Sequence, residues 1–96
     1  SFLAPQVRDH WLGLGICARA LDQLDLARIA FQTAVALAPQ SAAPRFHLCE
    51  VLCQHGRWSE AADQAAAFTA AAMAPEKASL ATEMKRLSAL IELRRR

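Results

Sequence analysis

The sequence contains few of the residues that build β-strands and tight turns. Valine, isoleucine and threonine together supply 9 of the 96 residues, and there are only three glycines and four prolines. A β-sandwich or β-barrel needs β-branched residues in its strands and turn-forming residues between them, so this composition argues against both folds. Alanine and leucine, which favour helices, are instead the two most frequent residue types. We therefore predict an all-α fold in a single domain.

Neither sign of charge dominates the chain, and long apolar runs are missing. The 11 Lys and Arg residues against 9 Asp and Glu give a net charge of +2, without the basic surplus typical of a nucleic-acid-binding domain. No run reaches the roughly 20 apolar residues that cross a membrane, and the N-terminus has no secretory signal pattern. Three cysteines, an odd and small number, suit a reducing compartment better than a disulfide scaffold. These features predict a cytoplasmic protein that neither binds nucleic acid nor inserts into membranes.

The first part of the chain repeats itself at a fixed offset. The tetrapeptide Leu-Ala-Pro-Gln occurs at residues 3–6 and again at residues 37–40. This offset equals the period of the tetratricopeptide repeat, about 34 residues. Five residues between the two copies match the pattern of that repeat: Trp11, Leu14, Gly15, Ala27 and Phe31. The chain therefore resembles a tetratricopeptide-repeat protein, in which helical hairpins stack into a right-handed superhelical array.

The residue types within the repeat predict how its helices pack and end. Gly15 and Ala27 are small enough to let two helices approach closely. The large side chains expected to fill the space around them are Trp11, Leu14, Leu24, Phe31 and Leu37. Four residues are predicted at helix ends: Gly56 in a left-handed turn, Pro44 in a first helical turn, and Ser41 and Ser59 as N-caps.

We divide the chain into four parts of one tetratricopeptide-repeat domain. Residues 1–7 end a preceding repeat, residues 8–41 and 42–75 form two repeats, and residues 76–96 form a capping helix. Helices are predicted at residues 7–21, 24–37, 44–54, 58–73 and 76–94. The last helix has an apolar stripe on one face, as the end of an array requires: Leu80, Met84, Leu87 and Ile91. Because the sequence opens at Ser1 and not at methionine, we expect a processed or excised fragment, and we expect that the preceding repeat, of which residues 1–7 are the tail, has been cut away.

Two stretches of the sequence resemble one branch of this family, the translocator chaperones of type III secretion (SycD/LcrH class). Residues 10–17, HWLGLGIC, are similar to the family's F-F/W-L-G-L-G-A-C stretch, and residues 44–52, PRFHLCEVL, to its P-x-F-H-A-A-E-C-L signature. The resemblance implies a cytoplasmic protein of a Gram-negative bacterium that keeps hydrophobic translocator proteins soluble for export. It also implies no cofactor or metal, and a concave groove, lined by the first helix of each repeat, that binds an extended apolar segment of the translocator.

Groove residues can be assigned from their positions in the repeat. First-helix positions 2, 5, 9 and 12 share one face because their spacings of 3, 4 and 3 follow the helical period. In the first repeat these positions hold Asp9, Leu12, Ile16 and Arg19, and in the second they hold Ala43, Phe46, Glu50 and Cys53. We predict a peptide-binding groove formed by Asp9, Leu12, Ile16, Arg19, Phe46, Glu50 and Cys53.

Within this predicted groove, the apolar and charged residues have different roles. Leu12, Ile16 and Phe46 are expected to be exposed as apolar anchors. Arg19 and Glu50 are expected to form bonds with the bound segment. The alternative for Leu12 and Ile16 is that they pack against the next repeat.

Other clusters of chemically active residues carry weaker signals. Cys49 and Cys53 stand four residues apart with His47 and His55 nearby. Because His47 and Cys49 point to different sides of a helix, we predict buried free thiols and no metal site. The histidines have no matching nucleophile and orienting acid, so we predict that the chain is not an enzyme. Arg94–Arg96 is expected to be a solvated helix end.

The favoured hypothesis is thus a chaperone of translocator proteins that acts by binding alone. One alternative is a tetratricopeptide-repeat scaffold module of a larger protein that mediates protein–protein interactions, and another is a regulator that binds a transcription factor. Without the first repeat, helix 7–21 would expose apolar side chains, so we also expect a homodimer or an exchanged oligomer.

Overall fold

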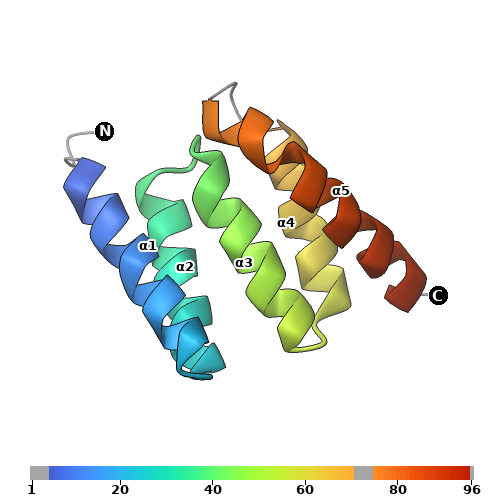
Figure 1. Cartoon of the computed structure of the whole chain (residues 1–96), viewed down its shortest axis with the longest axis horizontal. Coiled ribbons are helices and arrows are strands. Elements are labelled where there is room, and N and C mark those ends of the chain that lie inside the picture. Colours follow the sequence, from blue (N-terminus) through green and yellow to red (C-terminus); the bar gives the residue numbers. More distant parts are fainter. Residues whose placement is uncertain (1–4, 71–74, 96) are drawn as a thin grey trace.

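The computed structural model describes residues 5–70 and 75–95, and this part of the chain is helical throughout apart from short turns. Its five helices are α1 (Pro5–Ala20), α2 (Leu24–Leu37), α3 (Ala42–Gln54), α4 (Trp58–Ala70) and α5 (Pro75–Arg95), with no strand among the described residues (Figure 1). The all-α prediction is confirmed. The helix ends agree with the predicted ones to within two residues, except that the end predicted at residue 73 lies outside the described residues.

The helices pack in chain order as two layers. Figure 1 shows α1, α3 and α5 in front of α2 and α4, with the two ends of the chain on opposite sides of the molecule. α1 packs on α2 and α3 on α4, while α2 joins the two pairs by packing on α3; α5 contacts both α3 and α4. The result is an elongated molecule of 41 × 30 × 18 Å. None of the described helices is both long and apolar enough to span a membrane.

The turn between α1 and α2 and the turn between α3 and α4 have the same form. Asp22 after α1 and Gly56 after α3 have left-handed backbones, with φ of 61° and 72°. The next residue donates its backbone N–H to the carbonyl five residues earlier in both cases, Gln23 to Ala18 at 2.8 Å and Arg57 to Leu52 at 2.9 Å. This is the Schellman arrangement, which ends a helix sharply. The left-handed turn predicted at Gly56 is confirmed, and the turn at Asp22 has the same form one predicted repeat earlier.

The core lies around α3, which has seven buried residues. Phe31 on α2 is fully buried and lies directly over Gly15 of α1. A β-carbon added at Gly15 would come within 3 Å of three atoms of the Phe31 ring. The predicted close approach at Gly15 is therefore confirmed. The prediction that Leu14 fills the interior is wrong, because its side chain turns outward and is 36% exposed.

The apolar stripe of α5 packs as predicted. Met84 and Ile91 are buried, and Leu80 and Leu87 are partly buried against the core. At the end of α5, the Arg94 guanidinium lies 5.8 Å from the centre of the Trp58 ring, which is a cation–π distance. The stripe thus packs α5 against α3 and α4.

The serines predicted as N-caps have different roles. Ser41 does precede α3, but its side chain makes no capping bond, and its hydroxyl accepts a hydrogen bond of 3.3 Å from Arg8 Nη1 instead. Ser59 is the second residue of α4, so its prediction as an N-cap is wrong. Pro44 lies in the first turn of α3, as predicted, because a missing N–H costs nothing there.

Candidate functional site

A hollow of about 480 Å³ lies over α3, with α1 on one side of it and α5 on the other (Figure 1). Six residues line it: Arg19 from α1, Glu50, Cys53 and Gln54 from α3, and Leu87 and Leu90 from α5. Two leucines supply apolar surface, and an acid, a base and an amide supply polar groups. The hollow is an open depression and not an enclosed cavity, and it combines apolar walls with a few polar groups, as binding sites do.

Three of the predicted groove residues meet in this hollow. Arg19 is in the last turn of α1, and Glu50 and Cys53 lie one turn apart on α3. Ile16 precedes Arg19 by one turn, so it lies on the same side of α1, and its side chain is 40% exposed. Leu12, one turn further back, is partly buried and packs against the core, which agrees with the alternative weighed for this residue.

The structure separates Phe46 and Asp9 from the hollow. The predicted exposure of Phe46 is wrong: its side chain is 5% exposed, with its ring 6.5 Å from that of Phe68. The physical reason is the composition of α4, whose other buried residues are alanines, so that a large side chain from α3 fills the space between the helices. Asp9 is exposed and forms an ion pair of 2.8 Å with its neighbour Arg8.

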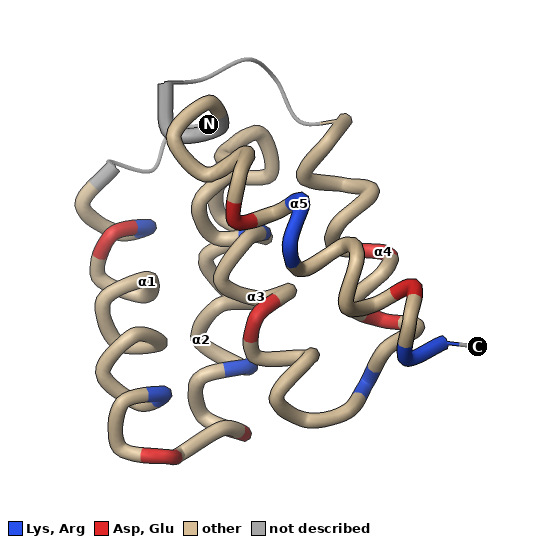
Figure 2. The backbone as a smooth tube through the Cα atoms, turned by 45° about the vertical axis from the view of Figure 1, so that its right-hand side comes forward, with Lys and Arg blue, Asp and Glu red and all other residues tan. Residues whose placement is uncertain are grey.

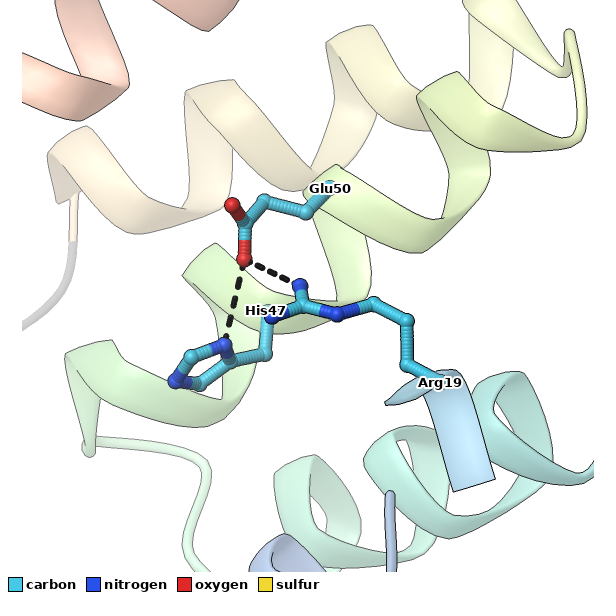
Figure 3. Close-up of polar contacts among 3 residues, drawn as sticks. All are labelled: Arg19, His47 and Glu50. Carbon is cyan, nitrogen blue, oxygen red and sulfur yellow. Dashed lines mark hydrogen bonds and ion pairs between the residues drawn. The ribbon is translucent and has the colours of Figure 1, made fainter. Parts of the chain in front are cut away.

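Glu50 is the centre of a polar cluster beside the hollow. Figure 3 shows Arg19 and His47 converging on the same carboxylate oxygen, while the other oxygen points away from both residues. Arg19 Nη1 lies 2.5 Å and His47 Nδ1 3.2 Å from Glu50 Oε1. The sequence predicts that Arg19 and Glu50 form bonds with a bound segment, whereas in the structure the two side chains form an ion pair with each other. Only their remaining atoms are available to a ligand.

The partners of Glu50 keep its carboxylate ionised. Burial alone would raise the pKa of Glu50. Hydrogen bonds with His47 and Arg19, together with the charge of Arg19, lower the pKa by a larger amount, so it lies below its ordinary value. The His47 ring is stacked on Phe31, with centroids 5.4 Å apart and planes at 19°. This stacking holds His47 in place, so the cluster is fixed to the core.

The cysteines near the hollow are protonated thiols at neutral pH. Burial, followed by the neighbouring Cys53 and Glu50, raises the pKa of Cys49 to about 12, and Cys49 Sγ donates to the Ala61 carbonyl at 3.4 Å. Burial also raises the pKa of Cys53, in spite of a hydrogen bond with Cys49 that lowers it. A thiolate is the nucleophile and metal ligand of cysteine, so neither thiol is activated for such chemistry.

The histidines considered for a metal site are also engaged elsewhere. His47 faces Glu50, and His55 Nε2 lies 3.7 Å from Asp25 Oδ1. Over residues 5–70 and 75–95, no three His, Cys, Asp or Glu side chains are placed to hold a metal ion together.

Sequence reasoning missed half of the residues that line the hollow. Gln54 is the last residue of α3, next to Cys53. Leu87 was assigned only to packing, and Leu90 was assigned no role. A signal for Leu90 does exist, because it follows Leu87 by one helical turn and lies outside the buried stripe.

Charge is spread thinly over the surface. Figure 2 shows basic and acidic residues interspersed along the chain, with the middle of α1 free of both.

A second, smaller hollow of about 250 Å³ lies between α2, α3 and α4, with Glu60 and Asp63 among its lining residues. It contains none of the predicted groove residues.

Comparisons of the chain with models of known protein families, with curated proteins and with solved structures found no match.

Proposed function

We propose that this chain is a binding module that holds an extended apolar segment of another protein in the hollow between α1, α3 and α5. Its partners on this proposal are the hydrophobic translocators of type III secretion, which it keeps soluble in the bacterial cytoplasm until export. The observation that carries the proposal is that Arg19, Glu50 and Cys53, chosen from repeat position alone, line one hollow together with two leucines. The resemblance of residues 10–17 and 44–52 to the translocator chaperones supplies the class of partner.

The proposal includes a fold of two tetratricopeptide repeats, residues 8–41 and 42–75, followed by a capping helix, in a right-handed superhelix. Two observations support it. The left-handed turns at Asp22 and Gly56 are separated by one repeat period, and the hydrogen bonds that close them have the same spacing. The contact between Gly15 and Phe31 also explains why the repeat needs a glycine and an aromatic ring at these positions.

Binding in this hollow would depend on apolar burial and a few hydrogen bonds. Leu87, Leu90 and Ile16 offer apolar surface, and a leucine-sized side chain of the bound segment would contribute up to about 1.5–3 kcal/mol if it became fully buried against them. The free oxygen of Glu50 and the Gln54 amide provide partners for the backbone N–H and C=O groups of an extended segment. Such binding involves no covalent step, and the raised pKa values of Cys49 and Cys53 leave both thiols protonated at neutral pH.

The test is co-expression of the chain with a hydrophobic translocator, with the amount of soluble translocator as the readout. We expect the Leu90→Asp and Ile16→Asp variants each to bind at least about tenfold more weakly, because each places a charge in the apolar part of the site. Leu26→Asp is the matched control, since Leu26 is comparably exposed but lies on α2.

Circular dichroism would verify that all three variants fold. A translocator that stays insoluble with the unmodified chain would contradict the proposal. So would an equal loss of binding in the groove variants and in the Leu26→Asp control.

A further inference from the structure

The second hollow, between α2, α3 and α4, lies on the opposite side of α3 from the first. Leu48 and Leu52 line the second hollow, and Glu50 and Gln54 line the first. Each leucine is two residues from its counterpart, which places the two sets about 200° apart around the axis of α3. A ligand in the second hollow would therefore leave the first hollow open.

The lining of the second hollow is apolar at the bottom and polar at the rim. Leu48 and Leu52 are each only 2% exposed, and Val35 of α2 is partly buried beside them. The remaining lining residues are polar: Gln32, Glu60, Asp63 and Gln64. All of these except Gln64 are exposed. A ligand that fits this lining has an apolar part that reaches inward and a polar part that stays near the rim.

The polar rim is rich in hydrogen-bond acceptors. Glu60, Asp63 and Gln64 occupy one face of α4, because they stand at positions i, i+3 and i+4. Each of the three side chains carries at least one acceptor oxygen, and an ionised carboxylate can only accept. No lining residue is a lysine or an arginine. The rim therefore favours a ligand that donates hydrogen bonds and carries positive charge.

Gln64 gives a second reason to expect a donor, independent of charge. Its Oε1 atom is buried and has no hydrogen-bond partner among the residues that the structure describes. A buried acceptor without a partner costs free energy, which a donor from a ligand would recover. The same helix face thus presents an unpartnered oxygen next to two carboxylates.

The basic side chains nearest the second hollow, on its helices and in the turn before α4, already have acceptors. The contacts are Arg28 with Asp25 at 3.8 Å, Arg45 with the Pro39 carbonyl at 2.9 Å, and Arg57 with Glu60 at 3.8 Å. Asp63, in contrast, has no ion-pair partner within residues 5–70 and 75–95. The chain as a whole has a net charge of +2, so a cation bound here would be held by these local groups.

Other kinds of occupant fit the second hollow less well. An apolar side chain would remove water from the acceptors without supplying donors, and an acidic one would meet Glu60 and Asp63. Two carboxylates are too few for a calcium ion, which takes 6–8 oxygen ligands. The volume of about 250 Å³ is also below the roughly 300–1,000 Å³ of pockets that enclose whole small molecules. A single long side chain with a positive end is the occupant that meets these conditions.

We propose that the second hollow binds an arginine side chain of a partner protein. The aliphatic stem of the arginine packs on Val35, Leu48 and Leu52, as long basic side chains do on apolar surfaces. Its guanidinium group reaches Asp63 and Gln64, because five N–H donors in a planar fork can bond a carboxylate and an amide oxygen together. This site adds a second binding surface to the one proposed for a translocator segment, and it does not depend on what the first hollow binds.

NMR titration of the ¹⁵N-labelled chain with N-acetylarginine methylamide tests the site, because this probe is an arginine side chain without charged ends. N-acetylcitrulline methylamide is the matched probe, with nearly the same shape and no charge. At low ionic strength we expect the arginine probe to shift the side-chain amide of Gln64, with a dissociation constant on the order of 1–10 mM. The citrulline probe is expected to bind at least about fivefold more weakly.

Three variants locate the binding. Asp63→Asn is expected to weaken binding of the arginine probe at least about fivefold, and Gln64→Leu at least about threefold, because each removes an acceptor. Glu83→Gln is the matched control: it also replaces an exposed acid by its amide, but on α5, so binding stays within about twofold. The amide spectrum of each variant verifies its fold.

Four results would overturn the proposal. One is the absence of shifts around Gln64 with up to about 50 mM arginine probe. The second is equal binding of the arginine and citrulline probes. The third is an equal loss of binding in Asp63→Asn and Glu83→Gln, which would indicate a general attraction between opposite charges. The last is a folded Gln64→Leu variant that binds the arginine probe as tightly as the unmodified chain.

Discussion

Glu50 shows how single residues link the stability of this molecule to pH. Its pKa is lower in the folded chain than the ordinary value of 4.5, since His47 and Arg19 bond to its ionised form. The stabilisation is therefore complete above the unfolded pKa and is lost as the pH falls through the lower, folded pKa.

We expect Glu50→Gln to lower the free energy of unfolding by about 1–2 kcal/mol at pH 7, because hydrogen bonds to a charged group are lost. The difference from the unmodified chain should be smaller at pH 3 than at pH 7, because pH 3 lies below the ordinary pKa of 4.5, where the unfolded chain binds a proton at Glu50 more readily than the folded chain does. Urea unfolding at both pH values measures it. An equal difference at pH 7 and pH 3 would contradict this role of Glu50.

Gly15 and Gly13 provide a matched pair on α1, because only Gly15 lies against another helix. An alanine at Gly15 would overlap the Phe31 ring, whereas nothing lies within 4 Å of the position of a β-carbon at Gly13. We expect Gly15→Ala to destabilise the fold by about 1–3 kcal/mol through overpacking. Gly13→Ala should stabilise it by about 0.5–1 kcal/mol, since alanine favours a helix. Thermal unfolding of the two variants compares them, and a stable Gly15→Ala variant would show that Phe31 does not press on α1.

At the scale of whole elements, α5 is a part of the core and not an appendage. Ile91 is 2% exposed, whereas Leu93, two residues later on the same helix, is 69% exposed. We expect Ile91→Ala to cost about 2–5 kcal/mol, the usual cost of a large-to-small change in a core. Leu93→Ala should change stability by less than about 0.5 kcal/mol. Chemical unfolding measures both, and equal effects of the two substitutions would indicate that α5 is detached in solution.

The helices could be predicted from the sequence more fully than the exposure of their side chains. Prolines and the glycine at residue 56 mark helix ends locally, so the helix ends were predicted closely. Phe46 and Leu14 were misassigned because their exposure depends on neighbouring helices. The small side chains of α4 draw Phe46 inward, and no described helix packs over Leu14. Leu90 was missed for the same reason, since its place in the hollow depends on how α5 packs on α3.

At the scale of the whole molecule, the two sides of α1 differ in what they border. The side with Ile16 and Arg19 borders the hollow, whereas Leu14 lies on the opposite side and is 36% exposed. The three helices in front in Figure 1, α1, α3 and α5, supply every residue that lines the hollow.

The most direct test of the central claim is to map where a translocator segment binds. Overlapping peptides that span a translocator would be titrated into the ¹⁵N-labelled chain, and the amide chemical shifts would be followed by NMR. We predict that at least one peptide shifts a set of amides centred on the hollow: Arg19, Glu50, Cys53, Gln54, Leu87 and Leu90. Shifts centred on Val7, Leu14 and Ile29, or no shifts with any peptide, would contradict the account.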